Sequence, residues 1–144
     1  MKIRKHLLLF LLLMTSAISS ARPLKLTQLT HTAWTSQDGA PLNIMSLAQG
    51  GDGSLWIASD SGLYRFDGIH FTIFEPSPGD PQFPTIGMRT VCVAKGDIVW
   101  VSLWLKGIAR IQNGHVRFYD ERDGLPPGTA EQMLQAPDGS TNSD

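Results

Sequence analysis

Five aspartates stand directly before a glycine, and paired carboxylates are the groups that many hydrolases and cation sites use. They are Asp38, Asp52, Asp67, Asp123 and Asp138. Asp-Gly is also the typical dipeptide of tight hairpin turns, because glycine accepts a positive φ and aspartate hydrogen-bonds to the nearby backbone. We interpret all five as turn residues. No Ser-His-Asp or Cys-His set can be built around them, so no catalytic residues are predicted and the chain is not expected to be an enzyme.

Metal and phosphate chemistry are not expected either. His70 and His115 are 45 residues apart, without a set of Cys, His or carboxylate partners at metal-ligand spacing. The glycine-rich stretch Gly50–Gly53 lacks the lysine that follows a phosphate-binding loop, which makes it a hairpin turn in our interpretation. No metal site and no cofactor are therefore predicted. Cys92, the single cysteine, stands in an apolar run and is expected to be a buried small hydrophobe.

Three residues are candidates for contact with a ligand. Trp104 is one, because aromatic faces bind sugar rings and it has no counterpart in the first of two sequence repeats. Arg65 and Arg110 are the others, since they recur once per repeat. They could make edge contacts between neighbouring units or form a ring of cations facing a central channel. Trp56 and Trp100 occupy equivalent central positions and are expected in the core between units.

The chain repeats itself with a period of about 44 residues. Trp56 and Trp100 are 44 residues apart, and Gly62 and Gly107 are 45 apart. Asp38-Gly39 and Asp123-Gly124 are 85 apart, about two periods. In a repeat of this length each unit is one supersecondary element that packs on the next. A residue that recurs once per repeat is therefore interpreted by its place in the unit.

Each unit predicts four short strands separated by Gly and Asp turns. The predicted strands are 44–49, 55–59, 63–66 and 70–74 in the first unit, and 90–94, 98–103, 108–111 and 116–119 in the second. The second strand of each unit is apolar on both faces, which is typical of a sheet covered on both sides. We therefore predict an all-β chain that forms a partial β-propeller, with two complete four-stranded antiparallel blades and the start of a third. A generic antiparallel β-sandwich is the alternative.

The predicted organisation follows from this repeat. We expect a signal peptide at 1–21, a leading segment with a closing strand at 22–43, blade 1 at 44–87, blade 2 at 88–130, and the start of a truncated blade 3 at 131–144. The face of the second unit that carries Ile98, Trp100, Ile108 and Ile111 is expected to lack a neighbour. Exposed apolar sheet favours association, so residues 22–144 alone should be aggregated, oligomeric or partly folded.

Three motifs of the first unit occur in order at Trp34–Pro41, Gly51–Ala58 and Gly62–Gly68. Together they resemble the two-component regulator propeller repeat, whose units read Asp-Gly-Leu-Pro, Asp-Gly-x-Leu-Trp-Ile-Gly and Gly-Leu-x-Arg-Phe-Asp-Gly. The resemblance covers about residues 27–140. The second unit departs from it, because it lacks the Asp-Gly-x-Leu turn and has Leu103–Lys106 where small residues are usual.

This resemblance implies the periplasmic ligand-sensing propeller of a bacterial signal-transduction receptor. Such receptors continue with a small β-sandwich, one transmembrane helix and a histidine kinase or diguanylate cyclase, and this chain would be a truncated fragment without them. The resemblance implies a small-molecule or glycan ligand and a homodimer in the full-length sensor, with membrane contact only through the leader or the missing helix. A truncated secreted propeller enzyme acting on carbohydrate and a non-functional relic are the alternatives.

The first 21 residues predict export. Lys2, Arg4 and Lys5 precede an apolar run of eight residues, Leu7–Met14, much shorter than the ~20 residues that span a bilayer. Ser19 and Ala21 suit a cleavage site after Ala21. The remainder has nine basic and 13 acidic residues and no clustered basic face, which excludes a nucleic-acid partner.

A fusion of residues 1–40 to a reporter that is active only outside the cytoplasm should be active in a bacterial host. Mass analysis of the exported product should find Arg22 at its N-terminus. A membrane-bound product that retains Met1 would instead show that the leader is an uncleaved anchor.

Overall fold

The computed structural model describes residues 31–84, 87–135 and 141–143. The chain divides into two units, Met1–Ala33 and Trp34–Asp144, and the strands of the described residues belong to the second unit. The predicted signal peptide lies outside the described residues, and the predicted domain limits stay predictions. Within the part that the structure describes, no helix is long and apolar enough to cross a membrane.

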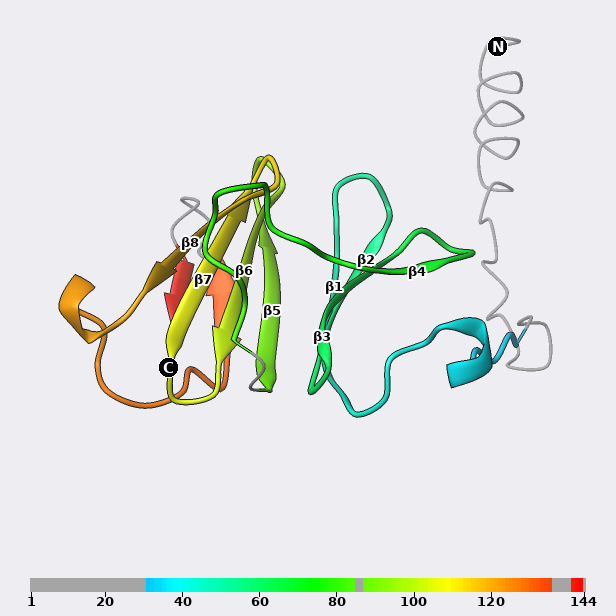
Figure 1. The fold of residues 1–144 in the computed structure, drawn as a ribbon, viewed down its shortest axis with the longest axis horizontal. Helices are drawn as coiled ribbons and strands as arrows, with labels where there is room; N and C mark the ends of the chain where they lie inside the picture. Colours follow the sequence, from blue (N-terminus) through cyan, green and yellow to red (C-terminus); the bar gives the residue numbers. More distant parts are fainter. Residues whose placement is uncertain (1–30, 85–86, 136–140, 144) are drawn as a thin grey trace, which may run out of the picture. The chain divides into compact units, whose positions relative to one another are not determined.

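The first sheet is a four-stranded antiparallel meander (Figure 1). Its strands are β1 (Ile44–Gln49), β2 (Leu55–Ser59), β3 (Gly62–Phe66) and β4 (Phe71–Ile73), and each pairs with the next along the chain. A short 3-10 helix, η2 (Ser36–Asp38), precedes the sheet. Short strands joined by tight turns are what the Gly and Asp pattern predicts.

The second sheet repeats this plan. It consists of β5 (Met88–Ala94), β6 (Ile98–Leu103), β7 (Gly107–Gln112) and β8 (His115–Tyr119), in that order. The irregularity in register near the start of β1 recurs near the start of β5, between Met88 and Val91. A second 3-10 helix, η3 (Glu121–Asp123), comes next, and β9 (Met133–Gln135) pairs with β10 (Thr141–Ser143). The predicted partial propeller is therefore confirmed.

Residues paired across neighbouring strands share a face of the sheet, so the register assigns every strand side chain to one of the two faces. The inner face of each sheet is the one that meets the other sheet, and the outer face is the opposite one. The inner face of the first sheet carries Ala48, Trp56, Ala58 and Leu63. The inner face of the second sheet carries Val91, Val99, Val101, Leu103, Ala109, Ile111 and Val116.

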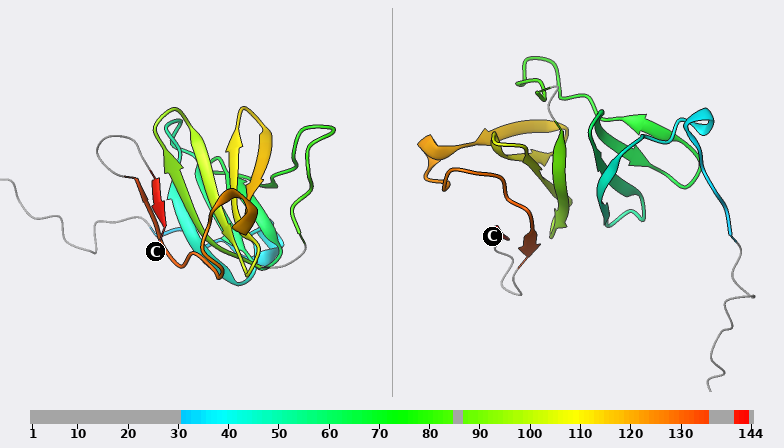
Figure 2. Two further views of the ribbon diagram at one scale, coloured as in Figure 1. Left: turned by 90° about the vertical axis from the view of Figure 1, so that its left-hand side faces the viewer. Right: turned by 90° about the horizontal axis from the view of Figure 1, so that it is seen from below.

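These two inner faces form the core, as the separate layers in Figure 2 illustrate. Val101 and Ala109 are fully buried, and Leu63 is 1% exposed. β5 of the second sheet lies against β1 and β2 of the first. Small aliphatic side chains from the second sheet thus meet a tryptophan and a leucine of the first, and close packing of this kind stabilises both sheets.

One prediction about the faces was wrong. Ile111 does not share a face with Trp100 and Ile108, because it pairs with Val99 and lies in the core, 3% exposed. Trp100 pairs with Arg110 and lies on the outer face. Trp56 and Trp100 occupy equivalent positions, both half-buried, but only Trp56 packs in the contact between the two sheets.

Side chains rather than backbone ladders link the first strands of the two sheets. The Ser46 hydroxyl accepts a hydrogen bond from the Val91 backbone N–H at 3.2 Å and lies 3.5 Å from the Thr90 hydroxyl. At the neighbouring turns, the Gly51 N–H donates to the Asp97 carboxylate at 3.3 Å. No strand pairing joins the two four-stranded sheets among the described residues, so the interface between them depends on packing and a few polar contacts.

Gly107 should tolerate no side chain. Its φ is +79°, and an added Cβ would lie 2.0 Å from the Tyr119 carbonyl oxygen. Gly96 has a φ of +84° and open space around it, so it is a matched control. We expect Gly96→Ala to cost about 1 kcal/mol of unfolding free energy, and Gly107→Ala to cost several times more or to prevent folding, as measured by urea denaturation. Equal losses would contradict the clash.

Candidate functional site

The loop between β6 and β7 differs from its counterpart in the first sheet. The first sheet uses the two residues Asp60-Ser61 between β2 and β3, whereas the second uses the three residues Trp104–Lys106. Leu105 has a φ of +52°, in the left-handed region that non-glycine residues avoid at a cost of about 1–2 kcal/mol. Trp104 is 40% exposed and Leu105 66% exposed. The additional residue therefore places two large apolar side chains at the surface.

Contacts from other parts of the chain hold this loop in place. The Trp104 N–H donates to the Gly87 carbonyl at 3.2 Å, and the Leu105 N–H donates to the Thr129 hydroxyl at 2.9 Å. The Arg89 guanidinium lies 3.9 Å from the centre of the Trp104 ring, in a cation–π contact. Arg89 covers one face of the indole, so a ligand that stacks on Trp104 would use the other.

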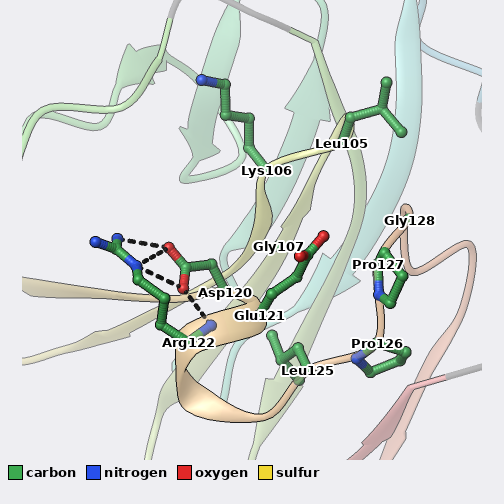
Figure 3. Close-up of a pocket in the computed structure, with 10 residues that line it drawn as sticks. All are labelled: Leu105, Lys106, Gly107, Asp120, Glu121, Arg122, Leu125, Pro126, Pro127 and Gly128. Carbon is green, nitrogen blue, oxygen red and sulfur yellow. Dashed lines mark hydrogen bonds and ion pairs between the residues drawn. The ribbon is translucent and has the colours of Figure 1, made fainter.

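A pocket of about 310 Å³ adjoins the loop. Its walls come from the β6–β7 loop, from η3 and from the segment after η3 (Figure 3). Figure 3 shows the Glu121 carboxylate turned toward the space between η3 and the proline wall. The lining residues are Leu105, Lys106, Gly107, Asp120, Glu121, Arg122, Leu125, Pro126, Pro127 and Gly128. The pocket thus combines an apolar wall with charged side chains.

The charged side chains of this pocket are not equally available to a ligand. Arg122 donates to both carboxylate oxygens of Asp120, from Nη2 to Oδ2 at 2.7 Å and from Nε to Oδ1 at 3.1 Å, and these side-chain hydrogen bonds hold the pKa of Asp120 below its ordinary value. The same contact raises the pKa of Arg122. Asp120 also caps η3, because its carboxylate accepts the Arg122 N–H at 2.8 Å. Lys106 and Glu121 are the charged side chains of the pocket outside this pair.

Arg65 lies away from this pocket, in the first sheet. It pairs with the Asp52 carboxylate and donates from Nε to the Ser54 hydroxyl at 3.1 Å. The Ser54 hydroxyl in turn donates to Asp52 at 2.6 Å. The Ser54 hydrogen bonds, with the Arg65 contact, lower the pKa of Asp52 to about 2. These contacts tie the β1–β2 turn to β3 within one sheet.

Arg110 occupies the equivalent place in the second sheet but has different partners. It donates to the Gln112 side-chain oxygen at 2.5 Å, and its guanidinium lies 6.0 Å from the Trp100 ring centre. The structure therefore does not bring the three sequence candidates together. Trp104 lies in the β6–β7 loop, whereas Arg65 and Arg110 lie within β3 and β7.

The histidines and the cysteine also have local roles. His115 lies 3.1 Å from the Asp80 carboxylate, and His70 lies 3.7 Å from Asp67. Among the residues that the structure describes, no group of three or more potential metal ligands comes together. Cys92 is a half-buried free thiol on the outer face of the second sheet, and burial raises its pKa.

Sequence reasoning missed the partners of Trp104 and the pocket beside it. Arg89 and Thr129 are 15 and 25 residues away along the chain, and no spacing rule connects them to Trp104. The Asp123-Gly124 dipeptide predicts a turn and nothing more. The signal that could have located the pocket is the additional residue in the hairpin, where the repeat alignment moves from 44 to 45 residues.

The fold defines two blades of a β-propeller and the start of a third. No family model matches the chain, and no curated protein matches it. Among solved structures, it is similar to the extracellular domain of BT3049 from B. thetaiotaomicron, a protein described as a putative hybrid two-component system. The TM-score is 0.63 at 17% sequence identity. The match covers 75% of this chain and 16% of that chain, so this chain spans a small part of its neighbour's length.

Asp52 should give the chain a pH-dependent stability. Its folded pKa of about 2 lies below the ordinary unfolded value of about 3.9. Its contribution is therefore complete above about pH 4 and is lost as the pH falls toward 2. Asp52→Asn should lower stability at neutral pH and flatten its loss between about pH 4 and 2.

Urea unfolding at several pH values measures this difference, and an NMR titration of the Asp52 carboxyl gives its pKa directly. Asp60→Asn, in the turn between β2 and β3, is the control for removing an exposed carboxylate. An Asp52 carboxyl that titrates at its ordinary value would contradict the prediction.

Proposed function

We propose that the chain is a ligand-sensing module of an exported bacterial signal receptor and performs no chemistry itself. The structural likeness to an extracellular domain of a two-component system supports this proposal. The engagement of acidic side chains in local structure supports it further. Asp38, Asp52, Asp67 and Asp120 each accept backbone N–H bonds within their own turns, the arrangement of structural rather than catalytic carboxylates.

The proposed location of the sensing site rests on one observation. The β6–β7 loop departs from the repeat, and Leu105 adopts a disfavoured backbone conformation at its centre. Strain of this kind persists only where the surroundings hold it, and it concentrates at binding sites. Here the loop is held by Gly87, Arg89 and Thr129, and it borders the pocket at η3. We assign ligand contact to Trp104 and to this pocket.

The chemistry of the site favours a small glycan or another polar small molecule with an apolar face. The indole face opposite Arg89 would stack on the C–H face of a sugar ring, while Lys106 and Glu121 offer a donor and an acceptor for hydroxyl groups. Function would lie in the periplasm, as the leader at 1–21 predicts. A kinase or cyclase output on the cytoplasmic side belongs to the same proposal.

The proposal can be tested by NMR titration with maltotriose, cellotriose and xylotriose. We expect at least one trisaccharide to shift the indole N–H resonance of Trp104 and the backbone resonances of Glu121 and Leu125. Trp104→Leu should abolish binding. Trp34→Leu is the matched control, because Trp34 is 43% exposed, close to the 40% of Trp104, and it should leave binding unchanged.

Two results would overturn this assignment. If none of the three sugars shifts these resonances, the glycan class is wrong. If binding is lost in Trp34→Leu and kept in Trp104→Leu, the site lies elsewhere.

A further inference from the structure

The outer face of the first sheet exposes apolar side chains that are covered at the equivalent places of the second sheet. The exposed residues are Ile44 (47% exposed), Leu47 (56%) and Ile73 (48%), all on this face by their pairing. Their counterparts, 44 or 45 residues later, are Met88, Val91 and Phe118. Met88 is 1% and Val91 5% exposed, and Phe118 packs against the core. At the centre of this outer face, Ile57 (2% exposed) and Phe66 (6%) are already buried within the chain. The open part of the receiving surface is therefore its β1 and β4 edges.

The outer face of the second sheet has the chemistry of that missing partner. Within the chain, the surface that covers the receiving positions is the inner face of the first sheet, with Trp56 and Leu63. The positions equivalent to Trp56 and Leu63 lie on the outer face of the second sheet, where they are Trp100 and Ile108. The remaining matches, each one period apart, are Ala48 with Cys92, Ala58 with Ser102, Arg65 with Arg110, and Phe74 with Tyr119.

We propose that two copies of this chain associate head to tail through these faces. The outer face of the second sheet in one copy covers the outer face of the first sheet in the next, and the contact reproduces the interface that already joins the two sheets within one copy. Such a heterologous contact continues until the rotation closes a ring. Propellers contain roughly 4–8 blades, so closure corresponds to about two to four copies of two blades each.

Two local features affect this contact. The Trp34 ring packs edge to face against Phe66, with ring centroids 4.9 Å apart, so it covers part of the receiving face but leaves Leu47 and Ile73 about half exposed. β9 contacts β5, in the position relative to β5 that β5 has relative to β1. The β1 strand of the next copy would take the place of β9, so the short β9–β10 pair has to move, which weakens the association.

Sedimentation velocity of the full chain over a wide range of concentration tests the proposal. We expect discrete oligomers whose share grows with concentration. Leu47→Asp and Ile73→Asp should each weaken association by about tenfold or more, since a buried leucine or isoleucine is replaced by a charge. Both positions are exposed in the single copy, so circular dichroism should show an unchanged fold. Ile69→Asp is the matched control, because Ile69 is 72% exposed in the β3–β4 turn, outside both faces.

A mixing experiment distinguishes this contact from a symmetric one. Ile108→Glu removes the other half of the interface, and Arg117→Glu, an exposed change on the same face, serves if Ile108→Glu does not fold. At concentrations where the wild-type chain first forms oligomers, Leu47→Asp alone and the second-face variant alone should each be monomeric. Mixed, they should form dimers and nothing larger, because each retains one intact face.

Three outcomes would overturn the proposal. A monomeric wild-type chain at the highest concentration would show that the faces are covered by something other than a second copy. Association that survives Leu47→Asp and Ile73→Asp, or that is lost equally in Ile69→Asp, would place the contact elsewhere. Failure of the mixed variants to form dimers would exclude the head-to-tail arrangement.

Discussion

The structure depends on one constraint: a four-stranded sheet that is apolar on both faces must be covered on both faces. The core between the two sheets satisfies this for one face of each. Burial there is nearly complete, with Val101 and Ala109 at 0% exposed, because small aliphatic residues of one sheet meet Trp56 and Leu63 of the other. The same requirement applies to the two outer faces. The outer face of the first sheet carries Ile44, and the outer face of the second sheet carries Trp100.

The sequence predicted most of the fold because the repeat shows it twice. Strands that recur at a period of about 44 residues, with glycines in the turns between them, define both the strand limits and their order. The face of Ile111 could not be obtained from spacing alone. It depends on register, since a shift of one residue moves a side chain to the opposite face, and the bond partners of β6 and β7 decide it.

The candidate site was less predictable, because it consists of contacts between distant parts of the chain. Trp104 stands out in the sequence as a departure from the repeat, yet its placement depends on Arg89 and Thr129, which belong to segments before and after the hairpin. Regular positions of a repeat are explained by packing, and irregular ones need another reason. Arg65 illustrates the first case, since its bonds to Asp52 and Ser54 serve the blade itself.

The two sheets are linked by side-chain contacts such as the hydrogen bond from the Val91 N–H to the Ser46 hydroxyl, and this kind of link has an evolutionary consequence. Because no described strand of one sheet pairs with a strand of the other, a whole blade can be gained or lost as a unit without breaking strand pairing. Unequal recombination between similar segments could then change the number of blades in single steps. The one-residue lengthening at Leu105 shows that a duplicated copy is afterwards free to diverge in its loops while its strands keep their register.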